Sequence, residues 1–264
     1  MRTVWMAVLA TLIAAAGGAS VPIRGPAFDF AEAREGTRHA DTGHRGPAFD
    51  IAQARKGPRH TLYLSFDADM TPGMLKRLQA GKVASWYDPA IVQYLRDNEI
   101  PAVIFASGLF AETYPDLIER LARDPLFAIG VHGYRHAAFT ANCYGLPFLH
   151  TDAERLDDLT HARDTIARIT GRAPTLFRYP GLCRDAHDDA LVRQAGLTVD
   201  TATVVAGDSF NHDVDAIVRQ VIRQARDGGT VIFHLGGPNA PVTLEALKRV
   251  VPELRKQGYE FARK

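Results

Sequence analysis

The chain has 264 residues, of which 46% are hydrophobic and 23% are charged, and its formal net charge is +1. This composition fits one large globular domain with a full core and excludes a disordered or fibrous chain. The sequence contains no basic stripe and no block of like charge, so it predicts no nucleic-acid partner.

The amino terminus has the three parts of a secretory signal peptide. Met1-Arg2 precedes an apolar run over residues 4–16, which is short for a membrane span, and small residues follow at 17–20. We therefore expect residues 1–19 to be a signal peptide and the mature protein to be exported, either periplasmic or extracellular. The mature chain should then have no stable membrane span. An uncleaved amino-terminal anchor is the alternative.

Residues 20–60 are polar and contain a near-duplicate, which we interpret as part of a linker. The segment 24–40 recurs as 45–61, and both copies begin with Arg-Gly-Pro-Ala-Phe-Asp. Two copies do not make a solenoid, because solenoid repeats must stack in series to bury a shared core. A short repeat that binds a cell wall or a partner is the alternative, and no residue pattern supports it.

From residue 61 onward, short apolar runs typical of strands alternate with helical patterns. The first predicted strand covers residues 61–66 and ends at Asp67. A helix is predicted to begin at Asp88-Pro89, where a capping carboxylate precedes proline at the first helical position. Further strands are expected at residues 102–106, 127–131, 175–179, around 199–205, 230–235 and 259–261, and further helices at 116–123, 151–171, 216–226 and 244–257.

The clearest helical signal lies between residues 151 and 171. Thr151 and Glu154 have the spacing of a capping box, and Gly171 is a typical helix end. Between them an apolar stripe has helical spacing: Leu156, Leu159, Ala162, Ile166 and Ile169.

About seven strand-then-helix units predict a parallel sheet covered by helices. Because such crossovers are right-handed, we expect a distorted (β/α) barrel of about seven parallel strands, in a single α/β domain over residues 61–264. Reacting groups in such barrels collect at the carboxyl ends of the strands. Polar residues follow the predicted strands at these ends: Asp67, Asp69, His132, His136, Arg178 and His234.

His132 and His136 have a spacing found in metal sites, because residues four apart can converge in a helix or a tight turn. Neutral imidazole nitrogens then reach one Zn²⁺-like ion. Taken alone, the pair favours two solvated loop histidines over a metal site.

The motifs, in their order along the chain, resemble those of the polysaccharide deacetylases of carbohydrate esterase family four, which share the nodulation-factor deacetylase homology domain. Ser-Phe-Asp-Ala-Asp at 65–69 resembles a Thr-Phe-Asp-Asp pattern, and His132 with His136 matches a His-x-x-x-His pattern. Residues 178–180 match Arg-x-Pro, and residues 231–234 resemble a late strand that ends in histidine. The resemblance covers about residues 60–262. It implies a metal-dependent hydrolase that removes N-acetyl groups from an N-acetylated glycan, such as peptidoglycan, a chitin-like chain or an exopolysaccharide.

The resemblance also implies a role for each matching residue. His132, His136 and one aspartate, which we assign to Asp69, would hold a divalent metal, with Zn²⁺ as the first expectation and Co²⁺ or another divalent ion as the alternative. Asp67 would be the base that activates water, and His234 would be the acid that protonates the departing amine.

Neighbouring residues would support these groups. Arg178 would orient Asp67 and keep it ionised. Asp208 would hold His234 in its working tautomer, with Asp200 and Asp213 as competitors for this role. At the substrate, the expected residues are Tyr179, Pro180 and Gly181, the last through a backbone N–H offered to the oxyanion.

The chain departs from the family pattern around the two aspartates. Ala68 separates Asp67 from Asp69, but residues i and i+2 of an extended segment point to one side, so both carboxylates can face a metal. The alternative is that Asp69 caps the following turn and that water or a more distant carboxylate, such as Asp88, completes the metal site.

A second departure concerns the walls of the substrate groove. Gly181 stands where the family usually has an aromatic residue, so Leu182 would have to supply that wall. Trp86 and Tyr87, at the end of a long segment from residue 70, either stack on a sugar or pack in the core.

Cys143 and Cys183 are the only two cysteines, and both lie in predicted loops just after site motifs. Export to an oxidising compartment favours a disulfide, and two free thiols are the alternative.

Two other functions stay open at this point. One is a hydrolase of a non-sugar amide or an ester on the same scaffold, and the other is a catalytically silent carbohydrate-binding relative. The sequence predicts nothing about oligomeric state.

Overall fold

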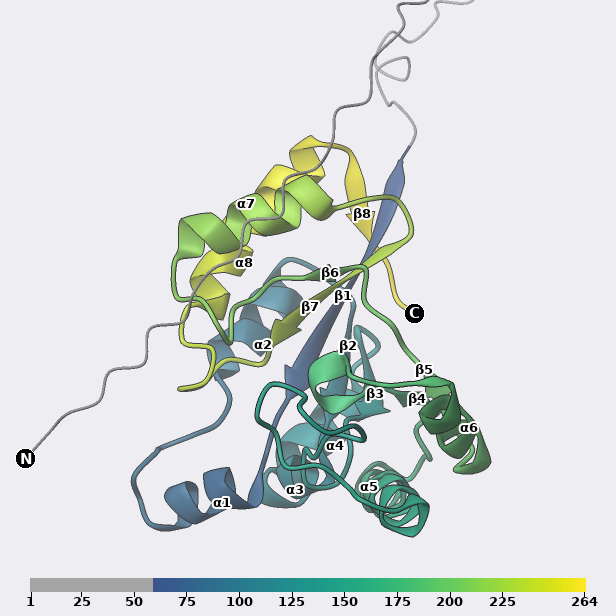
Figure 1. Cartoon of the computed structure of the whole chain (residues 1–264). Coiled ribbons are helices and arrows are strands. Elements are labelled where there is room, and N and C mark those ends of the chain that lie inside the picture. Colours follow the sequence, from purple (N-terminus) through teal and green to yellow (C-terminus); the bar gives the residue numbers. More distant parts are fainter. Residues whose placement is uncertain (1–58) are drawn as a thin grey trace, which may run out of the picture. The chain divides into compact units, whose positions relative to one another are not determined.

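The strands of residues 59–264, the part of the chain that the computed structural model describes, pair in parallel throughout (Figure 1). Their order across the sheet is β5-β4-β3-β2-β1-β7-β6, and β8 pairs with the beginning of β1. The strands are β1 (His60–Ala68), β2 (Ala102–Ala106), β3 (Phe127–Val131), β4 (Leu176–Phe177), β5 (Thr198–Val199), β6 (Val204–Val205), β7 (Gly229–His234) and β8 (Tyr259–Phe261). The predicted signal peptide and all but the last residues of the predicted linker, including nearly all of the duplicate, lie outside the described residues.

The sheet is curled, as the path of the chain between its two edge strands shows. Val199 ends β5 at one edge and Val204 begins β6 at the other. Five extended Cα steps span at most about 18 Å, so the two edges must lie close together. They are joined by the chain and not by strand pairing, which makes the barrel open. The predicted distorted barrel of parallel strands is confirmed.

Helices cover the outside of the curled sheet in two groups (Figure 1). In one group α8 packs against α2 and α7, and in the other α5 packs against α3, α4 and α6, while α1 contacts α3. The helices are α1 (Pro72–Gln79), α2 (Pro89–Asp97), α3 (Gly108–Thr113), α4 (Pro115–Arg123), α5 (Asp152–Thr170), α6 (Ala186–Gln194), α7 (Val214–Gln224) and α8 (Thr243–Lys256). None of these helices is both long and apolar enough to cross a bilayer.

The predicted caps form as expected. Asp88 accepts a hydrogen bond from the N–H of Ala90 at 2.9 Å and starts α2, with proline at the first position. Thr151 and Glu154 form the predicted capping box of α5, which ends at Gly171 with a left-handed φ of 72°. The middle of the predicted apolar stripe of α5 is buried.

Two kinds of element differ from the sequence-based prediction. Three short helices, α1, α3 and α6, were not predicted; Thr71 caps α1 with Met74 at the third position, and Asp185 caps α6 with Asp188 at the third position. The single strand expected around residues 199–205 is divided into β5 and β6. Between them Asp200 turns its carboxylate inward to Arg178, so the chain leaves one sheet edge and joins the other.

β1 lies in the middle of the sheet and carries the first site residues to its carboxyl end. In register, Asp67 is opposite Phe105 on β2 and opposite His234 on β7. The middle of the strand is fixed by burial, since the side chains of Leu62, Leu64 and Phe66 are almost inaccessible to solvent. A packed core below the site therefore sets the position of the polar residues above it.

Candidate metal centre and active site

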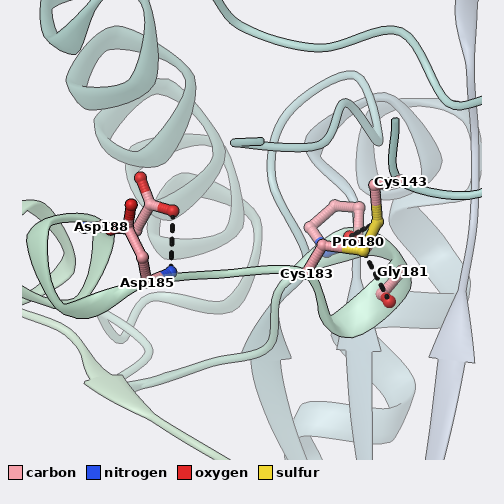
Figure 2. The surroundings of a disulfide bond; sticks show 6 residues. All are labelled: Cys143, Pro180, Gly181, Cys183, Asp185 and Asp188. Atoms are coloured by element: carbon pink, nitrogen blue, oxygen red, sulfur yellow. Dashed lines mark hydrogen bonds between the residues drawn. A yellow bond between two sulfur atoms is a disulfide. The ribbon is translucent and has the colours of Figure 1, made fainter. Parts of the chain in front are cut away.

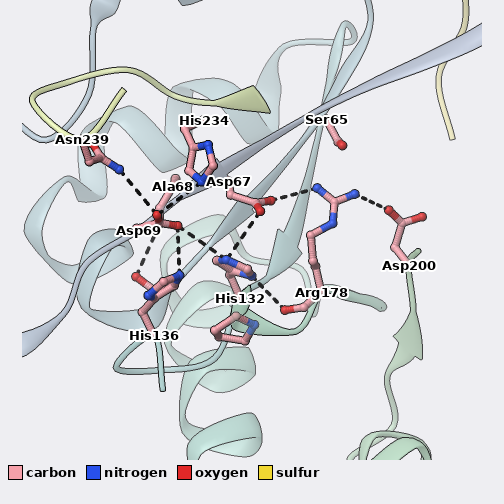
Figure 3. Close-up of polar contacts among 12 residues, drawn as sticks. Ser65, Asp67, Ala68, Asp69, His132, His136, Arg178, Asp200, His234 and Asn239 are labelled. Carbon is pink, nitrogen blue, oxygen red and sulfur yellow. Dashed lines mark hydrogen bonds and ion pairs between the residues drawn. The ribbon is translucent and has the colours of Figure 1, made fainter. Parts of the chain in front are cut away.

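Asp69, His132 and His136 bring three potential metal ligands together at the carboxyl end of the sheet (Figure 3). One ligand atom of each lies within 4.8 Å of the other two. Asp69 Oδ1 is 3.5 Å from His132 Nε2 and 3.3 Å from His136 Nε2. All three side chains are buried. The set of two imidazoles and one carboxylate is a common one for Zn²⁺ and related ions.

The hydrogen bonds of these residues fit a bound cation. Asp69 Oδ1 is buried and has no hydrogen-bond partner among residues 59–264, although it faces both imidazoles. His132 Nδ1 lies 2.8 Å from the carbonyl oxygen of Arg178, which can only accept, so this nitrogen carries the proton. Nε2 of His132 then presents its lone pair toward Asp69. A backbone partner that fixes the tautomer in this way is usual behind a metal-ligating histidine.

The protonation states of His136 and Asp69 also fit a bound cation. Burial lowers the pKa of His136 to about 4, and the neighbouring Asp69 only partly opposes this. Burial raises the pKa of Asp69, but the nearby imidazoles, His136 first, outweigh burial and hold the pKa below its usual value. At neutral pH the centre therefore offers a carboxylate and a neutral imidazole, which are the protonation states that bind metal.

A carboxylate on α5 shapes the loop between the two histidines. Buried Asp158 accepts the backbone N–H of Tyr134 at 2.6 Å and the guanidinium Nε of Arg135 at 3.1 Å. Gly133 turns the chain here with φ 69°, and a Cβ at this position would lie 2.8 Å from Asp158 Oδ2. The clearest predicted helix thus holds in place the loop that carries His132 and His136.

Asp67 is bound on its far side by a buried guanidinium (Figure 3). Arg178 is inaccessible to solvent and donates to Asp67 Oδ1 at 2.8 Å and to Asp200 Oδ2 at 2.6 Å. The other oxygen of Asp67 faces the centre, with Oδ2 3.7 Å from His132 Nε2. The guanidinium thus fixes the orientation of Asp67 and leaves its second oxygen directed at the candidate metal ligands, where a base would be needed.

His234 approaches the centre from β7 on the opposite side. Its Nε2 lies 3.7 Å from Asp69 Oδ2, and its Nδ1 lies 2.9 Å from Asp208 Oδ1. Burial lowers the pKa of His234, but the charge of Asp208 and its hydrogen bond outweigh burial and raise the pKa to about 10. Asp208 is itself fixed by the hydroxyl of Thr243 and by the N–H of His234. His234 is therefore a protonated donor at neutral pH.

The competing carboxylates have other partners. Asp200 pairs with Arg178, and Asp213 caps α7 through the N–H of Ala216. Asp88 caps α2, while Thr71, not Asp69, caps α1. The structure thus places Asp208 behind His234 and leaves Asp69 as the carboxylate beside the two histidines.

A cavity of about 290 Å³ opens above these groups. Asp67, Asp69, His132, His136 and His234 form its polar floor. Its apolar walls come from helical, loop and strand residues: Met74, Tyr144, Leu146, Leu182, Val205, Phe210 and Ile232. A small polar centre in a mostly apolar cleft is typical of a site for an organic substrate.

Of the three expected substrate residues, only Gly181 lines this cavity. Tyr179 and Pro180 are buried, and the Tyr179 hydroxyl donates to Asp189 at 3.0 Å. The side chains of Tyr179 and Pro180 therefore do not line this cavity, and a contact between them and the substrate stays a prediction.

The two cysteines form a disulfide beside Gly181 (Figure 2). Cys143 and Cys183 have Cα atoms 5.9 Å apart and are 40 residues apart in sequence. Gly181 has φ 69°, and a Cβ there would lie 2.5 Å from Cys143 Sγ. The close approach of the disulfide explains why glycine stands where an aromatic residue was expected.

Two aromatic residues considered for sugar binding lie elsewhere. Trp86 is buried, and its indole N–H donates to the carbonyl of Met74 at 2.9 Å. The Tyr87 ring packs edge-on against Phe110 and Tyr114. Trp86 and Tyr87 therefore pack in the core, which was the alternative to stacking on a sugar.

Sequence reasoning missed three residues of the site. Asn239 donates to Asp69 Oδ2 at 3.5 Å from the loop after β7. Tyr144 and Phe210 stand at the cavity, and their rings are 5.8 Å apart. Nothing in the local pattern of the sequence marked them, because they come from separate loops that the fold brings together.

The sequence is similar to a known protein family and to known enzymes. The family model described as polysaccharide deacetylase matches residues 54–199. The chain is 27% identical over 181 residues to the peptidoglycan-N-acetylglucosamine deacetylase of Bacillus cereus, a match that covers 66% of this chain and 78% of the relative. It is 25% identical over 187 residues to the chitooligosaccharide deacetylase of Rhizobium leguminosarum bv. trifolii, covering 65% of this chain and 80% of the relative.

Solved structures show the same architecture. A family 4 acetyl xylan esterase from Clostridium thermocellum, in complex with a cobalt ion, matches with a TM-score of 0.60 and 20% sequence identity. The match covers 77% of this chain and 87% of that chain. At this identity the likeness concerns the fold.

Proposed function

The chain belongs to the polysaccharide deacetylase family, and from this membership and the geometry of the site we propose that it is a metal-dependent hydrolase that removes N-acetyl groups from an N-acetylated glycan. The single observation that carries the proposal is the convergence of five groups on one cavity floor. Asp69, His132 and His136 face one another there, with Asp67 and His234 on either side at 3.7 Å.

The residues would divide the work of amide hydrolysis. Asp69, His132 and His136 would hold the divalent ion, which supplies Lewis-acid polarisation of the acetyl carbonyl and of water when bound. Asp67 accepts a proton from the water whose oxygen attacks the carbonyl carbon. Its other oxygen stays bound to Arg178, so the carboxylate keeps its orientation as it gains the proton.

Collapse of the tetrahedral species needs an acid at the nitrogen. His234 donates its Nε2 proton to the amine as the C–N bond breaks, which leaves acetate and a free amine on the sugar. Asp208 stabilises the charged imidazole before this transfer and fixes its orientation. The backbone N–H of Gly181, at the cavity wall, would donate to the oxyanion, a contribution of roughly 2.7–4 kcal/mol in comparable sites.

The proposal also includes the native ion, the substrate and the location of the protein. Two imidazoles and a carboxylate suit Zn²⁺, and the related esterase with cobalt supports Co²⁺ as the alternative. The relatives named for peptidoglycan and for chitooligosaccharides support a substrate that contains N-acetylated amino sugars. Export, inferred from the signal-like amino terminus, would bring the enzyme to such glycans.

Acetate release tests the proposal. Purified protein should be incubated with peptidoglycan, chitin-like oligosaccharides and an acetylated exopolysaccharide, each with and without chelator. We expect metal-dependent acetate release together with new free amines on one of these glycans. Acetate release from simple esters or non-sugar amides alone would favour the other hydrolase, and tight metal binding with no hydrolysis would favour a silent carbohydrate-binding protein.

A further inference from the structure

We propose that Lys264 is a positioning residue for the base Asp67, although it does not line the cavity. The side chains of four residues form one series of ion pairs, which we call the ion-pair series: Asp67, Arg178, Asp200 and Lys264. Lys264 neutralises Asp200 and so keeps Arg178 in place behind Asp67. This inference rests on the proposed function and adds to it a residue that acts from outside the site.

The segment after β8 brings Lys264 to this series and runs beside the first half of β1 (Figure 1). The N–H of Ala262 donates to a carbonyl of β1 at 3.1 Å, and Arg263 donates to a backbone carbonyl just before β3 at 3.1 Å. The ammonium nitrogen of Lys264 lies 5.7 Å from the centre of the Tyr63 ring and pairs with Asp200, which follows β5. The segment therefore crosses from β1 toward β5 and carries an ammonium group to the interior of the curled sheet.

The ion-pair series runs along the inner face of β1. Tyr63, beside Lys264, and Asp67, at the cavity, are four residues apart, so their side chains face the same side of the sheet and are separated by about 13 Å of strand. The side chains of Arg178 and Asp200 bridge this distance (Figure 3). Lys264 is thus linked to the site through side chains that contact one another in turn.

The guanidinium of Arg178 depends on two carboxylates for its position. Its Nη1 donates to Asp67 at 2.8 Å and its Nη2 donates to Asp200 at 2.6 Å, while Nε is buried and has no hydrogen-bond partner within residues 59–264. Asp200 is held in turn by Lys264, since one carboxylate oxygen pairs with the ammonium group and the other with the guanidinium. A displacement of Asp200 would therefore move Arg178.

The charges of the four side chains balance because Lys264 is present. The side chains of Arg178, Asp200 and Asp67 are 0%, 5% and 8% exposed, and the two carboxylates meet two cations. Without the ammonium group, one guanidinium against two carboxylates leaves a buried net charge of −1. Asp200 can then turn both oxygens to Arg178 in a bidentate pair, which draws the guanidinium away from Asp67.

The orientation of Asp67 depends on this guanidinium during turnover. Its Oδ1 is held by Arg178, and its Oδ2 faces the candidate metal centre, 3.7 Å from His132 Nε2. A rotation of the carboxylate moves Oδ2 from the water that it should activate, which lowers turnover. Substrate binding should change little, because neither Lys264 nor Asp200 lines the cavity.

The test measures kcat and KM of metal-loaded protein on an N-acetylated glycan. Lys264→Met removes the charge but keeps an unbranched side chain, and we expect kcat to fall about two- to thirtyfold with KM and metal content unchanged. Lys264→Arg keeps the charge and should recover most of the loss. Arg263→Met is the matched control, because it removes a neighbouring cation that donates to a backbone carbonyl, so kcat should stay at the wild-type value.

A double variant tests whether Lys264 acts through Asp200. Asp200→Asn removes the charge that Lys264 neutralises. Lys264→Met should therefore lower kcat in the wild-type background and have little further effect in the Asp200→Asn background. If circular dichroism shows that Asp200→Asn does not fold, the three single variants at residues 263 and 264 still decide the inference.

The results distinguish this inference from the proposed function. If wild-type protein releases acetate and Lys264→Met has the kcat of wild type, the positioning role is wrong and the deacetylase function stands. The role is also wrong if Arg263→Met loses as much kcat as Lys264→Met, if Lys264→Arg recovers nothing, or if the losses of Lys264→Met and Asp200→Asn multiply. If wild-type protein releases acetate from no N-acetylated glycan, the proposed function fails and the positioning role fails with it.

Discussion

Replacing Arg178 by Met should destabilise the fold strongly. The guanidinium is inaccessible to solvent and joins Asp67 at 2.8 Å and Asp200 at 2.6 Å. Methionine can fill much of the volume, but it leaves buried carboxylates without their shared cation. Removing one partner of a buried ion pair costs about 3–5 kcal/mol. Lys264 still pairs with Asp200, so the loss falls mainly on Asp67.

Urea unfolding followed by circular dichroism measures this loss as a change in the free energy of unfolding. The experiment should be done with chelator, because a bound cation near Asp67 would compensate part of the lost charge. The matched control is Arg96→Met, since Arg96 pairs with Asp124 at 2.7 Å but is 37% exposed. An exposed pair contributes about 0–1 kcal/mol. If Arg178→Met costs no more than Arg96→Met, the reasoning about the buried bridge is refuted.

Four other changes test individual residues of the site. Asp67→Asn should keep the metal but lower turnover roughly 10²–10⁴-fold, whereas Asp69→Asn should weaken metal binding, as measured by acetate release and by metal content after dialysis. Asp208→Asn removes the charge that raises the pKa of His234, so the alkaline limb of the pH profile of kcat/KM should move to lower pH. Gly181→Ala places a Cβ 2.5 Å from Cys143 Sγ and should lower kcat roughly ten- to hundredfold by displacing the oxyanion N–H.

The changes at Asp69, Asp208 and Gly181 each have an outcome that would contradict the assignment. Tight metal binding by Asp69→Asn would show that the ligand assignment is wrong. If the alkaline limb of the pH profile of kcat/KM stays where it is in Asp208→Asn, Asp208 does not set the pKa of the catalytic acid. For Gly181→Ala the control is Gly171→Ala, which has the same positive φ but open space around the new Cβ. Equal loss of kcat in both variants would mean that backbone strain alone, and not the contact with the disulfide, explains the effect.

The sequence predicted those features that depend on local patterns. Asp88 before Pro89, and Thr151 with Glu154, mark helix starts through hydrogen bonds that close within one turn, so the start residues could be read directly. The apolar strands were equally clear, because a parallel sheet buried on both faces requires continuous apolar runs. The positions of Asp69, His132 and His136 followed from the resemblance and from the rule that reacting groups follow parallel strands.

Features that depend on contacts distant in sequence could not be predicted in this way. The division of residues 199–205 into two strands depends on Asp200 meeting Arg178, which lies on the other side of α6 in the sequence. The meeting of Tyr144 with Phe210 requires the disulfide and the curl of the sheet together. Propensity and periodicity carry no information about either contact.

Metal reconstitution with product analysis tests the central claim most directly. Protein stripped by chelator should be titrated with Zn²⁺ while acetate and free amines are measured on an N-acetylated glycan. The site predicts that acetate release returns in proportion to added ion up to one ion per chain, with one free amine for each acetate, and that His132→Ala does not recover. Full acetate release by the stripped protein, or equal recovery by His132→Ala, would contradict a metal-dependent deacetylase built on this centre.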